Sequence, residues 1–203
     1  GTEVDDVGFL TALVDKLITE HGLDRSRVFA TGVSAGGFMS LRLALEAPAR
    51  FRAVAAVAAS VPAPGNFKCT PAAAGTGATS VMIMNGTEDP LVPFAGGEVN
   101  LLGLFYKGGN VRSSRDSAQY FADRNQLTGA PVTTETTVAE GVHVERVRWS
   151  KDASNFEVEL LAIHSGGHGM PQPYYKRPRL LGPSPMAPDG AEVIWGFFGR
   201  QQS

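Results

Sequence analysis

Residues 28–48 read VFATGVSAGGFMSLRLALEAP, and more of the fold can be inferred from this stretch than from any other. The apolar residues 28–30 predict a short strand, and the apolar residues that follow Gly37 recur with helical spacing as far as Pro48. Between them, residues 32–36 match the pattern G-x-S-x-G around Ser34. With 24 glycines in the chain the pattern alone is weak evidence. Its position, directly after a strand and before a helix, is where a nucleophilic serine is held above a sheet.

Strands and helices alternate on both sides of this stretch. Apolar residues at helical spacing predict a helix before it, from about residue 4 to residue 18. The strands expected after it are residues 53–59, 81–84, 142–149 and 156–163, and the helices are residues 116–125 and 189–198. The first of these strands is apolar throughout, which is typical of a parallel sheet covered on both faces. We therefore expect one α/β domain over residues 1–203, with a mostly parallel sheet flanked by helices. Residues 61–79 and 96–114 are expected to be irregular.

The composition excludes several classes of function. The chain has 203 residues, a net charge of −2 and a pI of about 6.1, so it offers no basic face for a nucleic acid. Its most apolar run, residues 53–63, is far shorter than the roughly 20 residues of a membrane span, and none is expected. No leader of basic and then apolar residues opens the sequence, so no signal peptide is expected within it.

Cys69 is the only cysteine. It can form neither a disulfide nor a cysteine metal cluster within the chain. One interpretation is a free or structural thiol. The other is a disulfide partner on a segment outside these residues, as an odd cysteine in an exported protein requires.

A serine nucleophile needs a base, and four histidines are candidates. We favour His168, because three glycines surround it and leave the backbone free to bring the ring over the carboxyl edge of the sheet. His164, four residues earlier, is the alternative. The two histidines have a metal-ligand spacing, but a segment so rich in glycine is not helical and no zinc site is expected. His21 is expected at a helix end and His143 on a half-exposed strand.

The histidine in turn needs a carboxylate to fix its tautomer. Asp89 follows the strand of residues 81–84 at the same edge of the sheet, whereas Glu88 beside it is expected to point away. The acidic residues predicted on helices or at a helix cap are poorer candidates: Asp116, Asp123 and Asp189. Ser34, Asp89 and His168 then occur in the chain order of α/β-hydrolase triads. The backbone N–H of Ala35 is the expected oxyanion donor.

Four segments resemble the esterase family of polyhydroxybutyrate depolymerases and of feruloyl and acetylxylan esterases, within the α/β-hydrolase superfamily. They are residues 4–9 (VDDVGF), 27–37 (RVFATGVSAGG), 85–93 (NGTEDPLVP) and 165–169 (SGGHG). The resemblance implies a carboxylic ester hydrolase that needs no cofactor and is often exported. Its substrate would be a small-molecule or polymeric ester. One departure concerns the histidine loop, which continues with Met170 where the family has an aromatic residue.

Two other functions remain open: a serine peptidase of the prolyl-oligopeptidase type, and a catalytically inactive hydrolase fold that serves as a binding module. The residues do not specify the ester. Four aromatic residues are candidates for an aromatic-acid pocket, although surface or core positions suit them as well: Phe94, Trp149, Tyr174 and Tyr175.

The resemblance also implies that early strands of the fold are missing. The full fold has about eight strands and its nucleophile follows the fifth, whereas here the strand of residues 28–30 is the first. This strand would be central in the complete sheet, and its unpaired N–H and C=O groups would form an exposed edge. We therefore expect an N-terminal segment, from the same or another chain, that also carries the second oxyanion donor.

Overall fold

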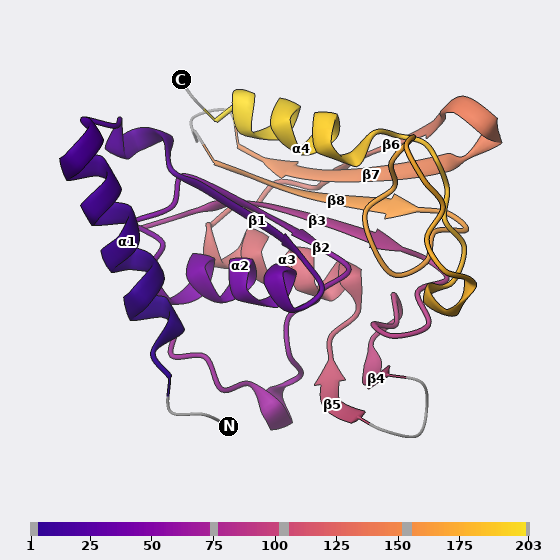
Figure 1. The fold of residues 1–203 in the computed structure, drawn as a ribbon, viewed down its shortest axis with the longest axis horizontal. Helices are drawn as coiled ribbons and strands as arrows, with labels where there is room; N and C mark the ends of the chain where they lie inside the picture. The colour runs from indigo at the N-terminus through magenta and orange to yellow at the C-terminus, as the bar shows by residue number, and fades with distance from the viewer. Residues whose placement is uncertain (1–3, 74–76, 102–105, 152–155, 202–203) are drawn as a thin grey trace.

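The computed structural model describes residues 4–73, 77–101, 106–151 and 156–201. Its centre is a six-stranded sheet in the order β1-β2-β3-β8-β7-β6, with helices on both faces (Figure 1). The strands are β1 (Phe29–Val33), β2 (Ala53–Val57), β3 (Ser80–Gly86), β6 (Val132–Thr137), β7 (His143–Ser150) and β8 (Glu157–Ile163). The first four in sheet order are parallel. The pairings of β8 with β7 and of β7 with β6 are antiparallel.

Two apolar cores sandwich the sheet. Every residue of β2, β3 and β8 is buried, which explains why apolar residues predominate in these strands. The exceptions in β8 are Glu157 and Glu159, which form ion pairs with arginines. Helices α2 (Ala35–Glu46) and α3 (Ser114–Arg124) cover one face, and α4 (Gly190–Gly199) covers the other (Figure 1). Asp189 caps α4 through hydrogen bonds to the N–H groups of Ala191 and Glu192, as its capping-box spacing predicts.

The β1 side of the sheet is the least covered part of the molecule. Within the described residues β1 pairs only with β2. Helix α1 (Asp6–His21) lies beside it, on the left of Figure 1, and contains no buried residue. Large apolar side chains are exposed around this edge: Val4, Phe9, Leu13, Leu17, Leu23, Val33 and Trp195.

Three strands were not predicted from the sequence. Residues 96–114, expected to be irregular, contain the antiparallel hairpin β4 (Gly97–Leu101) and β5 (Tyr106–Val111). Its glycines resemble those of a loop, and Gly96, Gly97 and Gly109 do have positive φ. Strand β6 is threonine-rich with every residue exposed, so it has no apolar alternation to detect. Strand β6 is the outermost strand of the described sheet and pairs with β7 alone.

Candidate active site

Ser34 occupies a sharp turn between β1 and α2. Its backbone has φ 54° and ψ −117°, a left-handed conformation that costs a non-glycine residue about 1–3 kcal/mol. The turn is held in place because the Ser34 N–H donates to the carbonyl of Val57 at 2.8 Å and the Ser34 carbonyl accepts from Phe38 N at 2.9 Å. The Ser34 side chain does not cap α2 and is half-buried. Its hydroxyl is therefore left available.

The glycines of this turn differ in how strictly they are required. A Cβ atom on Gly32 would lie 2.4 Å from the backbone carbon of Gly36, and one on Gly37 would lie 2.8 Å from the carbonyl oxygen of Val57. A Cβ on Gly36 would meet no described atom within 4 Å. Steric crowding therefore explains why residue 32, the first glycine of G-x-S-x-G, must be glycine. The last glycine of the motif, Gly36, is not required by crowding, whereas Gly37, which follows the motif, is.

Asp89 and His168 form a buried pair. His168 Nδ1 lies 2.8 Å from Asp89 Oδ2, and both residues are less than one-tenth exposed. The other carboxylate oxygen, Asp89 Oδ1, accepts hydrogen bonds from the N–H groups of Leu91 at 2.8 Å and Val92 at 2.9 Å. These bonds fix the carboxylate. Because the ionised carboxylate only accepts, Nδ1 carries the proton in this pair and Nε2 is free to act as a base.

The loops that carry this pair touch backbone to backbone. A Cβ on Gly86 would lie 2.1 Å from the carbonyl oxygen of Gly166, and the Glu88 N–H donates to the same oxygen at 2.9 Å. Behind His168, Arg177 packs against Gly169, whose φ of +134° suits glycine, and donates to the carbonyl of Met170. Burial lowers the pKa of the Arg177 guanidinium. Met170, which stands where the resemblance leads one to expect an aromatic residue, packs against Gly190 at the start of α4.

The other histidines and the carboxylate considered as base or acid are not part of this pair. His164 is exposed, and His143 is exposed on β7, where its ring nitrogen lies 3.0 Å from Thr137 Oγ1. Glu88 is exposed and accepts from the Ser165 hydroxyl. Within the described ranges no group of three or more His, Cys, Asp or Glu residues is arranged to hold a metal ion.

Ser34, Asp89 and His168 follow the ends of β1, β3 and β8, which are all parallel. Their carboxyl ends form one edge of the sheet, where ligands bind in folds of this class. In the described residues no hydrogen bond joins Ser34 to His168. Catalytic hydrogen bonds are often long in unliganded enzymes and tighten only when substrate binds. The structure therefore contains the Asp89–His168 pair and places Ser34 at the same edge of the sheet.

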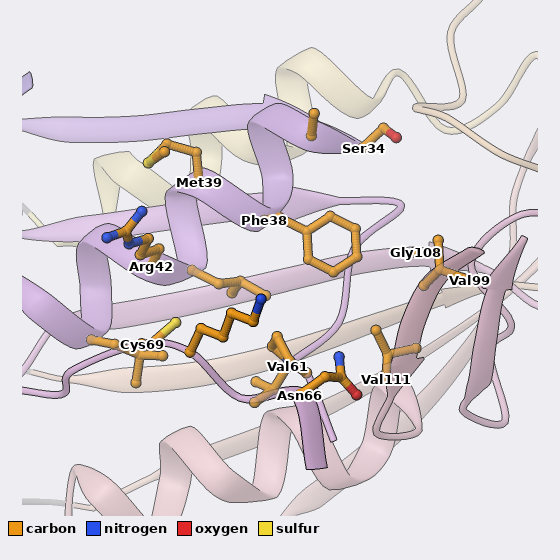
Figure 2. Close-up of a pocket in the computed structure, with 15 residues that line it drawn as sticks. Ser34, Phe38, Met39, Arg42, Val61, Asn66, Cys69, Val99, Gly108 and Val111 are labelled. Atoms are coloured by element: carbon orange, nitrogen blue, oxygen red, sulfur yellow. The ribbon is translucent and has the colours of Figure 1, made fainter. Parts of the chain in front are cut away.

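A pocket of about 570 Å³ opens beside Ser34 (Figure 2). Its walls come from α2, from residues 61–69 and from the β4–β5 hairpin. None of the four aromatic candidates lines it: Trp149 and Phe94 pack in the core, while Tyr174 and Tyr175 are exposed. The aromatic residue that lines the pocket is Phe38. Its position four residues after Ser34, one helical turn away, is the signal in the sequence that could have identified it.

The chain resembles known esterases in sequence. Residues 5–102 match the Phospholipase/Carboxylesterase family. The NocK protein of Nocardia uniformis subsp. tsuyamanensis, an esterase by its name, is 31% identical over 191 residues, which cover 87% of this chain and 52% of that protein. Feruloyl esterase C of Emericella nidulans is 30% identical over 96 residues, or 47% of this chain and 33% of the enzyme. The chain thus spans about half the length of NocK, or less for the feruloyl esterase.

Solved structures show the same fold. The acetyl xylan esterase from Aspergillus awamori superposes with a TM-score of 0.60 at 14% identity, covering 96% of this chain and 67% of that one. Esterase PE8 superposes with a TM-score of 0.53 at 16% identity, covering 98% and 66%. At such identities the likeness concerns the fold alone. It confirms the predicted fold class, and the chain corresponds to about two thirds of the fold in these esterases.

Proposed function

We propose that this chain, which has the α/β-hydrolase fold and resembles esterases in sequence, is a serine hydrolase of carboxylic esters. The observation that carries the proposal is the buried Asp89–His168 pair at the sheet edge that also holds Ser34 in its strained turn. Structural ion pairs seldom occupy a sheet edge beside a strained serine and an open pocket. That combination is typical of a catalytic triad.

In this mechanism Ser34 attacks the ester carbonyl while His168 Nε2 takes the hydroxyl proton. His168 then gives that proton to the departing alcohol, and water releases the acid by the reverse route. Asp89 holds the imidazole in the required tautomer and stabilises its positive charge. No transfer of a proton to Asp89 is needed.

The oxyanion that forms needs N–H donors. Ala35 is the first residue of α2, so its N–H belongs to the free donors of a helix N-terminus, and no described backbone carbonyl accepts from it. The positive end of the helix dipole adds to this stabilisation. Ala35 therefore supplies one donor to the oxyanion hole.

The second donor belongs, in this proposal, to a segment that pairs with β1. The open side of β1 and the apolar side chains exposed around it support such a segment. Since one donor is worth about 10²–10³-fold in turnover, residues 1–203 alone should be a slow enzyme.

Export from the cytoplasm and a polyhydroxybutyrate or feruloyl substrate stay predictions. No helix of the described residues is long and apolar enough to cross a membrane.

A fluorophosphonate reagent tests the nucleophile directly. Mass spectrometry of the labelled protein should place one adduct on Ser34, and Ser34→Ala should abolish both labelling and hydrolysis of short-chain nitrophenyl esters. Ser165→Ala is the matched control, because this exposed serine lies in the histidine loop and its hydroxyl donates to Glu88, while its backbone N–H bond to Thr87 is kept in the variant. An adduct elsewhere, or full activity in Ser34→Ala, contradicts the proposal. Methyl ferulate and hydroxybutyrate oligomers then identify the substrate.

A further inference from the structure

The pocket beside Ser34 runs along helix α2. Phe38 and Arg42 follow Ser34 by four and eight residues, so both lie on the helix face that begins at the nucleophile. Eight residues of helix correspond to about 12 Å. Figure 2 shows Ser34 and Arg42 at opposite ends of the pocket, with the Phe38 ring between them. The pocket is therefore long enough for an extended chain.

The position of His168 indicates which half of an ester enters this pocket. His168 must reach the leaving oxygen to protonate it, so the alcohol lies on the His168 side of the ester carbonyl. The pocket is lined by Ser34 and Ala35 but by neither His168 nor Asp89. Because the base does not line this pocket, we assign it to the acyl group and not to the alcohol.

The lining of the pocket is mainly apolar but includes charged residues. The residues along its length are mainly apolar: Phe38, Met39, Leu41, Leu45, Val61, Pro62, Val99 and Val111. Arg42, Lys68 and Cys69 contribute to the remainder, and Figure 2 shows Cys69 near the Arg42 end. Burial raises the pKa of the Cys69 thiol, so this group is neutral near pH 7.

The two cations differ in how their charge is balanced. Arg42 lies 3.1 Å from Glu46, and this carboxylate raises the pKa of the guanidinium. Glu46 also accepts from the N–H of Thr70 and stays in place beside Arg42. Lys68, by contrast, is exposed and forms no ion pair with any residue that the structure describes. The lining thus carries one positive charge that a ligand could neutralise.

We propose that the pocket selects esters of acids whose apolar chain ends in an anionic group, and that Lys68 binds this group. The inference rests on the proposed function, because it assigns the acyl side of the same site. A simple fatty acyl chain offers Lys68 no counter-charge, whereas a chain whose terminal carboxylate reaches the Lys68 ammonium gains a charge-assisted contact.

Binding of the free acids tests the pocket without turnover. Octanoate and suberate have the same chain length, and suberate adds the second carboxylate. By calorimetry, suberate should bind the wild-type chain about 3- to 10-fold more tightly, and the preference should weaken at high salt. Lys68→Met should remove the preference while keeping the aliphatic stem, and Lys68→Arg should retain it. Lys16→Met, on α1 and outside the pocket, should change nothing.

Equal binding of both acids by the wild-type chain overturns the inference, as does a preference that survives in Lys68→Met. The nitrophenyl monoester of suberate and nitrophenyl octanoate provide the kinetic counterpart. The ratio of their kcat/KM values should fall several-fold in Lys68→Met relative to wild type. If hydrolysis does not depend on Ser34, the proposed function is wrong. The calorimetric comparison of suberate with octanoate would still test whether the pocket prefers a terminal carboxylate.

Discussion

The two parts of the candidate site are held in different ways. Asp89 and His168 follow β3 and β8, which pair on both sides, and both residues are buried and hydrogen-bonded. Ser34 follows β1, which has one neighbour in the described sheet, and its half-buried hydroxyl forms no hydrogen bond with His168. Asp89 and His168 are thus fixed by the interior of the sheet. Ser34 is fixed by a turn at its margin.

This difference indicates which part of the site is complete. A buried polar pair is costly unless its hydrogen bonds are made, and the Asp89–His168 pair makes its own within the chain. Ser34 depends on the conformation of its turn and on whatever covers β1. We therefore expect changes at the pair to abolish catalysis, and changes around β1 to act through local stability.

The largest effect is expected from His168→Ala. In the proposed mechanism His168 serves both proton transfers, so its loss should lower kcat for a nitrophenyl ester by about 10⁶-fold. His164→Ala is the matched control: this histidine lies four residues earlier, is exposed, and should leave kcat unchanged. If His164→Ala were the more damaging change, the assignment of the base would be wrong.

Asp89→Asn should lower kcat by about 10⁴-fold, less than the loss of His168. The asparagine oxygen can still accept from Leu91 and Val92, so the loop should fold as before. Its amide would instead face His168 Nδ1 and favour the tautomer that cannot serve as the base. Unchanged thermal unfolding combined with this loss of activity is the expected signature. Glu88→Gln, next to it and exposed, should cost little.

Hydrogen exchange should distinguish the two sides of the sheet. Ser34 N donates toward β2, and backbone amides alternate in direction along a strand, so the amides of Thr31 and Val33 face the open side of β1. They should exchange on the order of 10³-fold faster than those of β3. Equal protection in residues 1–203 would show that the edge is already covered, for example by a second copy of the chain.

The smallest effects are expected at the glycines of the serine turn. Gly32→Ala should cost about 1–3 kcal/mol of unfolding free energy, because its Cβ would meet the backbone of Gly36. Gly36→Ala should be neutral or stabilise by about 0.5–1 kcal/mol, since alanine is the better helix former and the space is open. Chemical denaturation of both variants gives the comparison. A large cost for Gly36→Ala would contradict the open geometry.

The central part of the fold could be predicted from the sequence because burial leaves a clear pattern. The apolar strands β2, β3 and β8 and the strand–turn–helix around Ser34 all lie close to their predicted positions. Asp89 and His168 could be chosen because each follows such a strand and parallel strands bring their ends together. Their hydrogen bond agrees with that choice, while the catalytic roles remain to be tested.

The margins of the fold left weaker signals. The hairpin of β4 and β5 is rich in glycine and polar residues, and strand β6 is exposed throughout, so their residues resemble loop. The pocket could not be predicted for a related reason. Its walls join α2 to residues 61–69 and to the hairpin, and this contact arises only in three dimensions. Lys68 has no neighbouring sequence pattern that marks a ligand.

The contact of Gly86 with Gly166 has a mechanical consequence. With no side chains between them, and with the Glu88 N–H bonded to the Gly166 carbonyl, we expect the loops of Asp89 and His168 to shift together. The distance from Ser34 to His168 should then vary more than the distance from Asp89 to His168. Thermal motion, a bound substrate or a new strand beside β1 would each change the reactivity of this site through the distance from Ser34 to His168.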